Sequence, residues 1–168
     1  QVGHKTAYEY GRLANETAKI YRKFDEDLEL IVCGSSNDKM ATYPEWEAEV
    51  LDQSYEFVDY ISLHKYWNNY PKDTLNYLAS HYELDEYIGT VRSVIQYIKA
   101  KKRAKNDVYI CFDEWNPWYH TNKRDHELLK TWDWPEAPHL FEDPYNLEDA
   151  LLVGTVINSF IRNADTVS

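Results

Sequence analysis

The stretch DVYICFDEWNPWYH, residues 107–120, decides the fold and raises the question of function. Its first part, residues 108–112, is a short apolar run rich in β-forming residues, which predicts a buried strand. Two acids, Asp113 and Glu114, end that run, and three large aromatic residues and an asparagine follow within a few positions. A cluster of polar and aromatic side chains at the end of a strand predicts a fold in which the ends of several strands meet and form one site.

The rest of the chain alternates between helices and strands. Apolar residues at three- and four-residue steps predict helices, and short apolar runs predict strands, of which the first is expected to be buried on both faces. In chain order, the predicted elements are a helix at 6–24, a strand at 28–34, a helix at 43–57, a strand at 60–66, a helix at 84–98, the strand at 108–112, a helix at 146–163 and the first residues of a strand at 165–168.

Strict alternation of this kind predicts parallel strands joined by crossover helices, which is the α/β class. Two architectures fit the order: an open doubly wound sheet, or part of an eight-stranded (β/α)8 barrel. No glycine-rich phosphate-binding motif follows any of the strands. The nucleotide-binding versions of the open sheet therefore lose support, and the barrel is favoured.

Composition limits the partners. The chain has 168 residues, enough for one domain, and 29 acids against 18 bases give it a formal net charge of -11. Such a charge is repelled by nucleic acid and by anionic membrane surfaces, so neither is an expected partner. No apolar run approaches the ~20 residues that a membrane span needs. Cys33 and Cys111 each lie in an apolar run, which predicts small buried residues and not a disulfide.

Three strand ends carry polar and aromatic side chains. In parallel α/β folds the carboxyl ends of the strands share one mouth where ligands bind. Hydroxyl, amide, imidazole, phenol and carboxylate groups beside indole rings describe a polar pocket with stacking walls, as a sugar requires. The residues are Ser35, Ser36, Asn37, His64, Tyr66, Trp67, Asp113, Glu114, Trp115 and Asn116.

Asp113 and Glu114 are both candidates for the catalytic carboxylate. Side chains alternate along a strand, so both acids are not expected to face the same cavity. Glu114 is favoured because it is the last residue of the strand, and it could serve as general base, metal ligand or nucleophile. The plain alternative is a helix cap or an ion-pair partner. The aromatic neighbours of Glu114 weigh against that alternative, because they are costly to expose without a ligand or a partner.

The sequence gives little reason to expect a metal or a cofactor. His64 is expected to be a hydrogen-bonded core or pocket residue, while His120 and His126, with Asp125 and Glu127, match no known zinc-ligand spacing. No serine or cysteine lies in a G-x-S-x-G motif, which disfavours an acyl-transfer nucleophile. The irregular connection at 116–144 is longer than the ~12 to 15 residues beyond which a loop is usually functional or disordered.

Five collinear motifs resemble one known family. They are GHKTAYEYGRLANE from residue 3, VCGSSN from 32, VDYISLHKY from 58, FDEWNPWYH from 112 and YNLEDALLVG from 145. Together they resemble glycoside hydrolase family 51, the α-L-arabinofuranosidases, over essentially the whole chain. The resemblance implies a (β/α)8 barrel joined to a β-sandwich. It also implies retaining exo-hydrolysis that releases terminal L-arabinofuranose from arabinan, arabinoxylan and related oligosaccharides.

The resemblance also assigns roles to particular residues. It implies that Glu114 is the nucleophile at the end of the seventh strand and that Tyr66 hydrogen-bonds and orients it. His64 would support the sugar pocket at the end of the sixth strand, and Trp118 and Asn116 would bind substrate. At Pro117 this chain departs from the family, which often has Val there, so the loop after Glu114 is expected to shift slightly.

The resemblance implies that residues 1–168 are part of the barrel, from about helix 4 to the start of strand 8. The acid/base glutamate would precede this segment, and the β-sandwich would also lie outside it, so the segment alone is expected to be inactive and poorly folded. Bacterial members are mostly intracellular and often oligomeric, which implies a cytoplasmic homo-oligomer. Two other readings remain open: a related retaining β-glycanase, and a non-catalytic carbohydrate-binding module.

Overall fold

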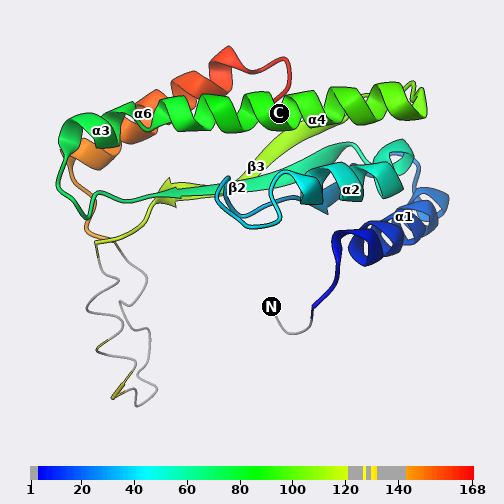
Figure 1. Cartoon of the computed structure of the whole chain (residues 1–168), viewed down its shortest axis with the longest axis horizontal. Helices are drawn as coiled ribbons and strands as arrows, with labels where there is room; N and C mark the ends of the chain where they lie inside the picture. Colours follow the sequence, from blue (N-terminus) through cyan, green and yellow to red (C-terminus); the bar gives the residue numbers. More distant parts are fainter. Residues whose placement is uncertain (1–3, 121–126, 128–129, 132–142) are drawn as a thin grey trace.

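The computed structural model describes residues 4–120, 127, 130–131 and 143–168, and it has the predicted α/β architecture with parallel strands (Figure 1). The alternation of elements is confirmed, and their bounds differ from the predicted ones by a few residues. In chain order the elements are α1 (Ala7–Phe24), β1 (Ile31–Cys33), α2 (Glu45–Ser54), the 3-10 turn η1 (Tyr55–Phe57), β2 (Tyr60–Trp67), α3 (Thr74–Ala79), α4 (His81–Lys102), β3 (Tyr109–Pro117) and α6 (Leu147–Arg162).

The three strands form a parallel sheet in the order β1-β2-β3. Beyond β3, Val167 forms an isolated parallel bridge with Ile110. The Ile110 amide donates to the Thr166 carbonyl at 2.8 Å, and the Ser168 amide donates to the Ile110 carbonyl at 3.0 Å. The predicted start of a further strand at 165–168 is therefore confirmed.

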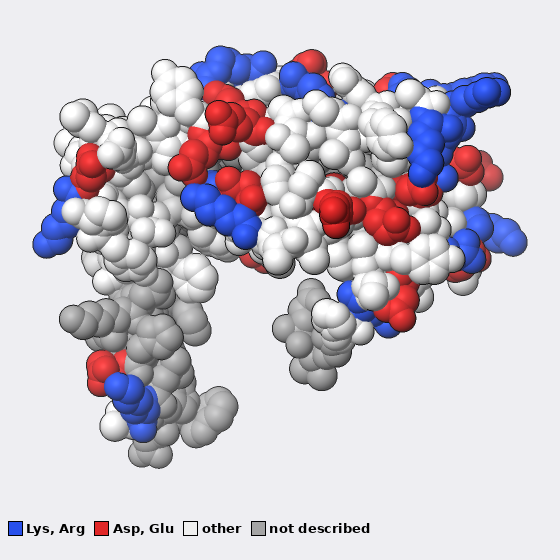
Figure 2. Space-filling model, in the orientation of Figure 1, with Lys and Arg blue, Asp and Glu red and all other residues white. Residues whose placement is uncertain are grey.

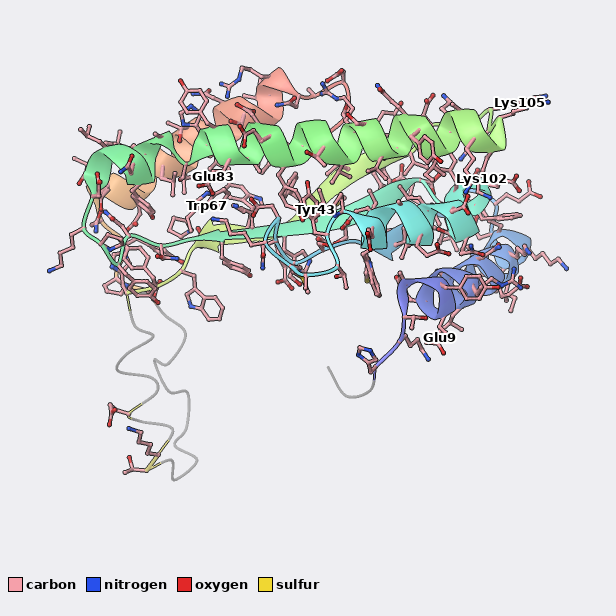
Figure 3. The ribbon with its side chains drawn as sticks, viewed as in Figure 1. Glu9, Tyr43, Trp67, Glu83, Lys102 and Lys105 are labelled. Carbon is pink, nitrogen blue, oxygen red and sulfur yellow. The ribbon has the colours of Figure 1, made fainter. Side chains whose placement is uncertain are left out.

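Local capping explains where several helices begin. Thr6 and Glu9 form a reciprocal capping box at the start of α1, where Figure 3 labels Glu9, and Asn146 and Asp149 do the same for α6. The short helix α3 was not among the predicted elements, although Asp73 caps it by accepting a hydrogen bond from the Asn76 amide at 3.2 Å. A polar residue before a short six-residue helix was the available signal, and it is weak.

The hydrophobic core lies between one face of the sheet and the helices α2, α4 and α6 (Figure 1). Apolar side chains from both layers are buried there, since each layer has one apolar face to remove from water. The core includes Val50 and Leu51 of α2, Ile61 and Leu63 of β2, Leu84, Ile88 and Val91 of α4, Ile110 of β3, and Leu152 and Val156 of α6.

The opposite face of the sheet is largely uncovered by the residues that the structure describes. Ile31 and Cys33 are exposed on this face, whereas Val32 between them is buried in the core. The prediction that the first strand is buried on both faces was therefore wrong. The prediction that both cysteines are buried was also wrong, because Cys33 is exposed and Cys111 is half-buried. Both thiols are free.

The free edge of β1 is capped by side chains. Tyr10 accepts a hydrogen bond from the Cys33 amide at 2.9 Å, and the Trp46 indole donates to the Cys33 carbonyl at 2.9 Å. The next amide along the edge, that of Ser35, donates to the buried carboxylate of Glu47 at 2.7 Å. These contacts reduce the number of unpaired backbone groups along this edge of the sheet.

Surface charge is mixed on the face shown in Figure 2, with a group of Lys and Arg at the C-terminal end of α4, where Figure 3 labels Lys102 and Lys105. Cations at this end of a helix interact favourably with the helix dipole. Within the described residues, no helix has the length and apolarity needed to cross a membrane.

Candidate active site

The carboxyl ends of β2 and β3 bring the predicted site residues together. The strand register pairs His64 with Glu114 and Tyr66 with Asn116, so the side chains of neighbouring strands lie side by side on the uncovered face. Trp118 follows directly after β3, and its amide donates to the Trp67 carbonyl at 3.0 Å. The expectation that parallel strands gather these groups at one end of the sheet therefore holds for all five predicted residues.

Glu114 is held through one of its two carboxylate oxygens. The Tyr66 hydroxyl donates to Oε2 at 3.2 Å, and Nδ1 of His64 lies 3.4 Å from the same oxygen. Burial, the hydrogen bond to Glu114 and the charge of that carboxylate all raise the pKa of Tyr66. The phenol is therefore protonated at neutral pH and acts as a donor to Glu114.

A β-bulge brings Asp113 onto the same face as Glu114. Ser62 pairs with Cys111 and His64 pairs with Glu114, so the step of two residues on β2 corresponds to three on β3. The extra residue interrupts the alternation of side chains. Nε2 of His64 consequently lies 3.1 Å from Oδ1 of Asp113, while its other ring nitrogen faces Glu114. The expectation that one of the two acids must point elsewhere was wrong for this reason.

The aromatic residues divide between the site and the core. Trp118 is 39% exposed, and its ring centroid lies 5.4 Å from that of Tyr66. Trp115 was predicted to lie at the site, but it packs edge-on against Phe160 of α6, with the two ring centroids 5.2 Å apart. Trp67 is also on the core side and is 4% exposed. The wall of the site is therefore built by Tyr66 and Trp118.

Asn116 binds a residue that the sequence analysis did not single out for the site. Its amide nitrogen donates to the hydroxyl of Tyr145 at 2.8 Å. Tyr145 comes just before α6 and is 55% exposed, so its ring borders the same open face. The signal for this contact in the sequence is weak, since Tyr145 lies 29 positions away across the long connection.

A polar cavity of about 560 Å³ adjoins the site. Ser36 and Asn37, which were predicted as strand-end site residues, line it together with Tyr66 and Trp67, whereas Ser35 is buried. Figure 3 labels Trp67 at the end of β2 and Glu83 on the first turn of α4, and both line the cavity. The buried ammonium of Lys65 pairs with Asp38 at 2.6 Å on the cavity wall, which neutralises its charge.

His120 has a structural role in the described residues. Its Nε2 lies 2.7 Å from Oδ2 of the buried Asp149, whose other oxygen accepts a hydrogen bond from Tyr77 at 2.9 Å. This network anchors the end of the β3 strand to α3 and α6. Of the other residues weighed as a metal set, Asp125 and His126 lie outside the described residues, as does most of the long connection at 116–144.

Comparisons with known proteins find relatives over nearly the whole chain. A family profile described as the alpha-L-arabinofuranosidase C-terminal domain matches residues 113–168. The chain is 50% identical, over 99% of its length, to an intracellular exo-alpha-(1->5)-L-arabinofuranosidase from Acetivibrio thermocellus. It is 49% identical, over the same share, to a protein of that name from Bacillus subtilis. The chain spans 33% of the length of each relative.

The solved structures that resemble this chain are also alpha-L-arabinofuranosidases. A family 51 alpha-L-arabinofuranosidase from Bifidobacterium longum superposes with a TM-score of 0.90 at 29% identity, covering 99% of this chain and 35% of that one. The thermostable alpha-L-arabinofuranosidase from Thermotoga petrophila gives a TM-score of 0.75, also at 29% identity, covering 99% of this chain and 30% of that one.

The proteins that this chain resembles are thus glycoside hydrolases. Among them are a family 51 alpha-L-arabinofuranosidase of known structure and relatives named as arabinofuranosidases, so the resemblance found in the motifs is confirmed.

Proposed function

We propose that this chain is part of a retaining, exo-acting α-L-arabinofuranosidase in which Glu114 is the nucleophile. The observation that carries the proposal is the pair of contacts to Glu114, because Tyr66 and His64 both approach Oε2. Within the described part of the chain, no side chain forms a hydrogen bond or an ion pair with Oε1. Two groups on one oxygen fix the carboxylate and leave the other oxygen to attack a sugar.

The reaction then runs in two displacements. An oxygen of Glu114 attacks the anomeric carbon, the glycosidic C–O bond breaks, and the leaving oxygen takes a proton from a second carboxylic acid. Water activated by that second group then attacks the same carbon and releases Glu114 as a carboxylate. Retention requires the two carboxyl groups to lie ~5 to 5.5 Å apart. The second carboxyl is proposed to come from outside residues 1–168.

The barrel is proposed as the setting of this site. Neighbouring strands follow one another in the chain, the helices pack on one face, and Ser62, His64, Tyr66 and Glu114 lie on the other. In a (β/α)8 barrel the uncovered face would be the interior. Residues 1–168 would then run from about helix 4 to the start of strand 8, with the other strands and the β-sandwich elsewhere in a longer protein.

The proposed substrates are terminal non-reducing α-L-arabinofuranosides in arabinan and arabinoxylan oligosaccharides. The names of the relatives support this choice, since two are exo-(1->5)-arabinofuranosidases and a third, from Bifidobacterium longum at 38% identity, is an exo-(1->6)-arabinofuranosidase. Those two relatives are also named intracellular, which supports a cytoplasmic location. A homo-oligomer is proposed for the full-length protein. No cofactor, nucleic acid or membrane partner enters this mechanism.

Substrate choice tests the proposal. The full-length protein is expected to hydrolyse an aryl α-L-arabinofuranoside far faster than the aryl β-glucoside or β-xyloside, and proton NMR of early product should show the α-anomer. The 168-residue chain alone should give no turnover. Preference for the glucoside or xyloside would favour a β-glycanase. Sugar binding without hydrolysis by the full-length protein would favour a binding module.

Tyr66→Phe is expected to lower kcat on the arabinofuranoside about 10- to 100-fold, as loss of one hydrogen bond to a charged group would. The change removes only the hydroxyl that contacts Glu114. The matched control is Tyr97→Phe, which removes a hydroxyl from an exposed residue of α4. The two variants should be compared by steady-state kinetics, and equal kcat values would remove Tyr66 from its orienting role.

A further inference from the structure

Tyr145 is an exposed aromatic residue beside the proposed active site, and the mechanism described above does not use it. It lies just before α6, and its hydroxyl accepts a hydrogen bond from the Asn116 side chain at 2.8 Å. Asn116 is the residue that the strand register pairs with Tyr66. Burial, the contact with Glu114 and the nearby phenol of Tyr145 all raise the pKa of Tyr66, so the two phenols lie close together.

The geometry of β3 places Tyr145 nearer to the open end of the sheet than Glu114. Alternate residues of a strand share a face, so Asn116 follows Glu114 on the same side of β3. A strand advances about 3.3 Å per residue, which puts Asn116 about 7 Å beyond Glu114 toward the carboxyl end. Trp118 comes next in the same direction. Through its bond to Asn116, Tyr145 therefore lies at a level between the carboxylate of Glu114 and the mouth.

The Tyr145 side chain is held at both ends. Its backbone amide donates to the Asp143 carbonyl at 3.0 Å, and the next residue, Asn146, caps the first turn of α6. At the other end, the hydroxyl oxygen accepts from Asn116, which leaves the hydroxyl hydrogen to be donated. A tyrosine held in this way offers a rigid apolar surface and a donor at low cost in conformational entropy.

We propose that Tyr145 is a substrate-contacting residue of a leaving-group subsite, where its ring packs against the second sugar of an arabino-oligosaccharide and its hydroxyl donates to an oxygen of that sugar. This inference rests on the proposed function, because it takes Glu114 as the nucleophile of an exo-acting enzyme. The sugar that is attacked lies at the level of Glu114, and the rest of the oligosaccharide extends toward the carboxyl ends of the strands. That path passes Asn116 and Tyr145.

The chemistry of the subsite suits a neutral sugar ring. One face of a sugar carries C–H groups that pack on an aromatic ring, while its hydroxyl and ring oxygens accept hydrogen bonds. Burial and the carboxylates of Asp143 and Asp149 raise the pKa of Tyr145, so the phenol is protonated at neutral pH and can donate. Trp118, whose ring packs on that of Tyr66, adds a second aromatic surface at the same end of the sheet.

The test compares α-(1→5)-arabinobiose with methyl α-L-arabinofuranoside as substrates of the full-length protein. Both have an alkoxide leaving group, and only the disaccharide has a second ring to occupy the subsite. Tyr145→Ala should lower kcat/KM for the disaccharide about 10- to 50-fold, from the loss of a hydrogen bond and an aromatic contact, and change kcat/KM for the methyl glycoside less than about twofold. Tyr145→Phe, which removes only the hydroxyl, should lower the value for the disaccharide about 3- to 10-fold.

Tyr97→Ala is the matched control, since Tyr97 is an exposed tyrosine of α4. Its kcat/KM values on both substrates should be those of the wild type. Should Tyr145→Ala not fold, Tyr145→Phe keeps the ring and gives the same test, because the ratio of the two kcat/KM values is measured on one protein sample.

Two results would overturn the proposal. One is a ratio of kcat/KM values that stays at the wild-type value in the Tyr145 variants. The other is an equal loss on both substrates, which would mean that Tyr145 acts on the first sugar or on the fold. Failure of the proposed function itself would look different, because the wild-type protein would then hydrolyse neither arabinoside, or Glu114→Gln would remain active.

Discussion

Glu114→Gly in the full-length protein should lower turnover of an aryl α-L-arabinofuranoside by a factor on the order of 10⁴, because the covalent route is closed without the nucleophile. Added azide should restore part of the activity. The small anion can occupy the space left by the carboxylate and attack the anomeric carbon from the same side. The product is then an arabinosyl azide whose configuration is inverted relative to the substrate.

The configuration of the azide product is the decisive measurement. If Glu114 were instead the acid/base, azide would attack the glycosyl-enzyme ester from the opposite side, and the product would keep the configuration of the substrate. Glu29→Gly provides a matched control, since Glu29 is exposed, precedes β1 and contacts Tyr60 at the other end of the sheet. Wild-type turnover by Glu114→Gly would remove this residue from catalysis.

The sequence could predict which groups meet at the site because the rules involved are simple. Alternating elements imply parallel strands, and parallel strands place their carboxyl ends together. That reasoning was sufficient to bring His64, Tyr66 and Glu114 to one place, and the structure has them in contact. The motif resemblance then supplied the chemistry, and the comparisons support the same family.

Local departures from regular geometry could not be predicted. The bulge at Asp113 depends on how β3 pairs with β2, and a strict period of two gives the wrong direction for that side chain. The same bulge determines on which side of the sheet each indole lies. Trp115 packs on Phe160 on the core side, while Trp118 packs on Tyr66 at the site.

Burial of the strands depends on residues far from them in the chain. An apolar run such as residues 28–34 does not reveal whether one or both faces are covered, because the cover is supplied by other elements. In the described structure the helices cover a single face, so Ile31 and Cys33 are exposed while Val32 is buried.

Gly34→Ala should destabilise the protein by about 3 kcal/mol, the upper end of the usual cost of overpacking. A Cβ at Gly34 would lie 2.4 Å from the carbonyl oxygen of Ser62, 2.9 Å from the Leu63 side chain and 3.1 Å from that of Ile61. The same Ser62 oxygen accepts the hydrogen bond of the Gly34 amide at 2.9 Å. The methyl group would therefore push β1 away from β2 at the site end of the sheet.

Gly89→Ala is the matched control for steric overlap, because the same methyl group at Gly89 of α4 would meet no atom within 4 Å. Alanine is the better helix former by about 0.5–1 kcal/mol, so this variant should be slightly more stable than the wild type. Thermal unfolding of the full-length protein, followed by circular dichroism, should show opposite shifts of the melting temperature for the two variants. Equal shifts, or an unchanged melting temperature for Gly34→Ala, would mean that β1 and β2 do not approach as closely as the carbonyl of Ser62 requires.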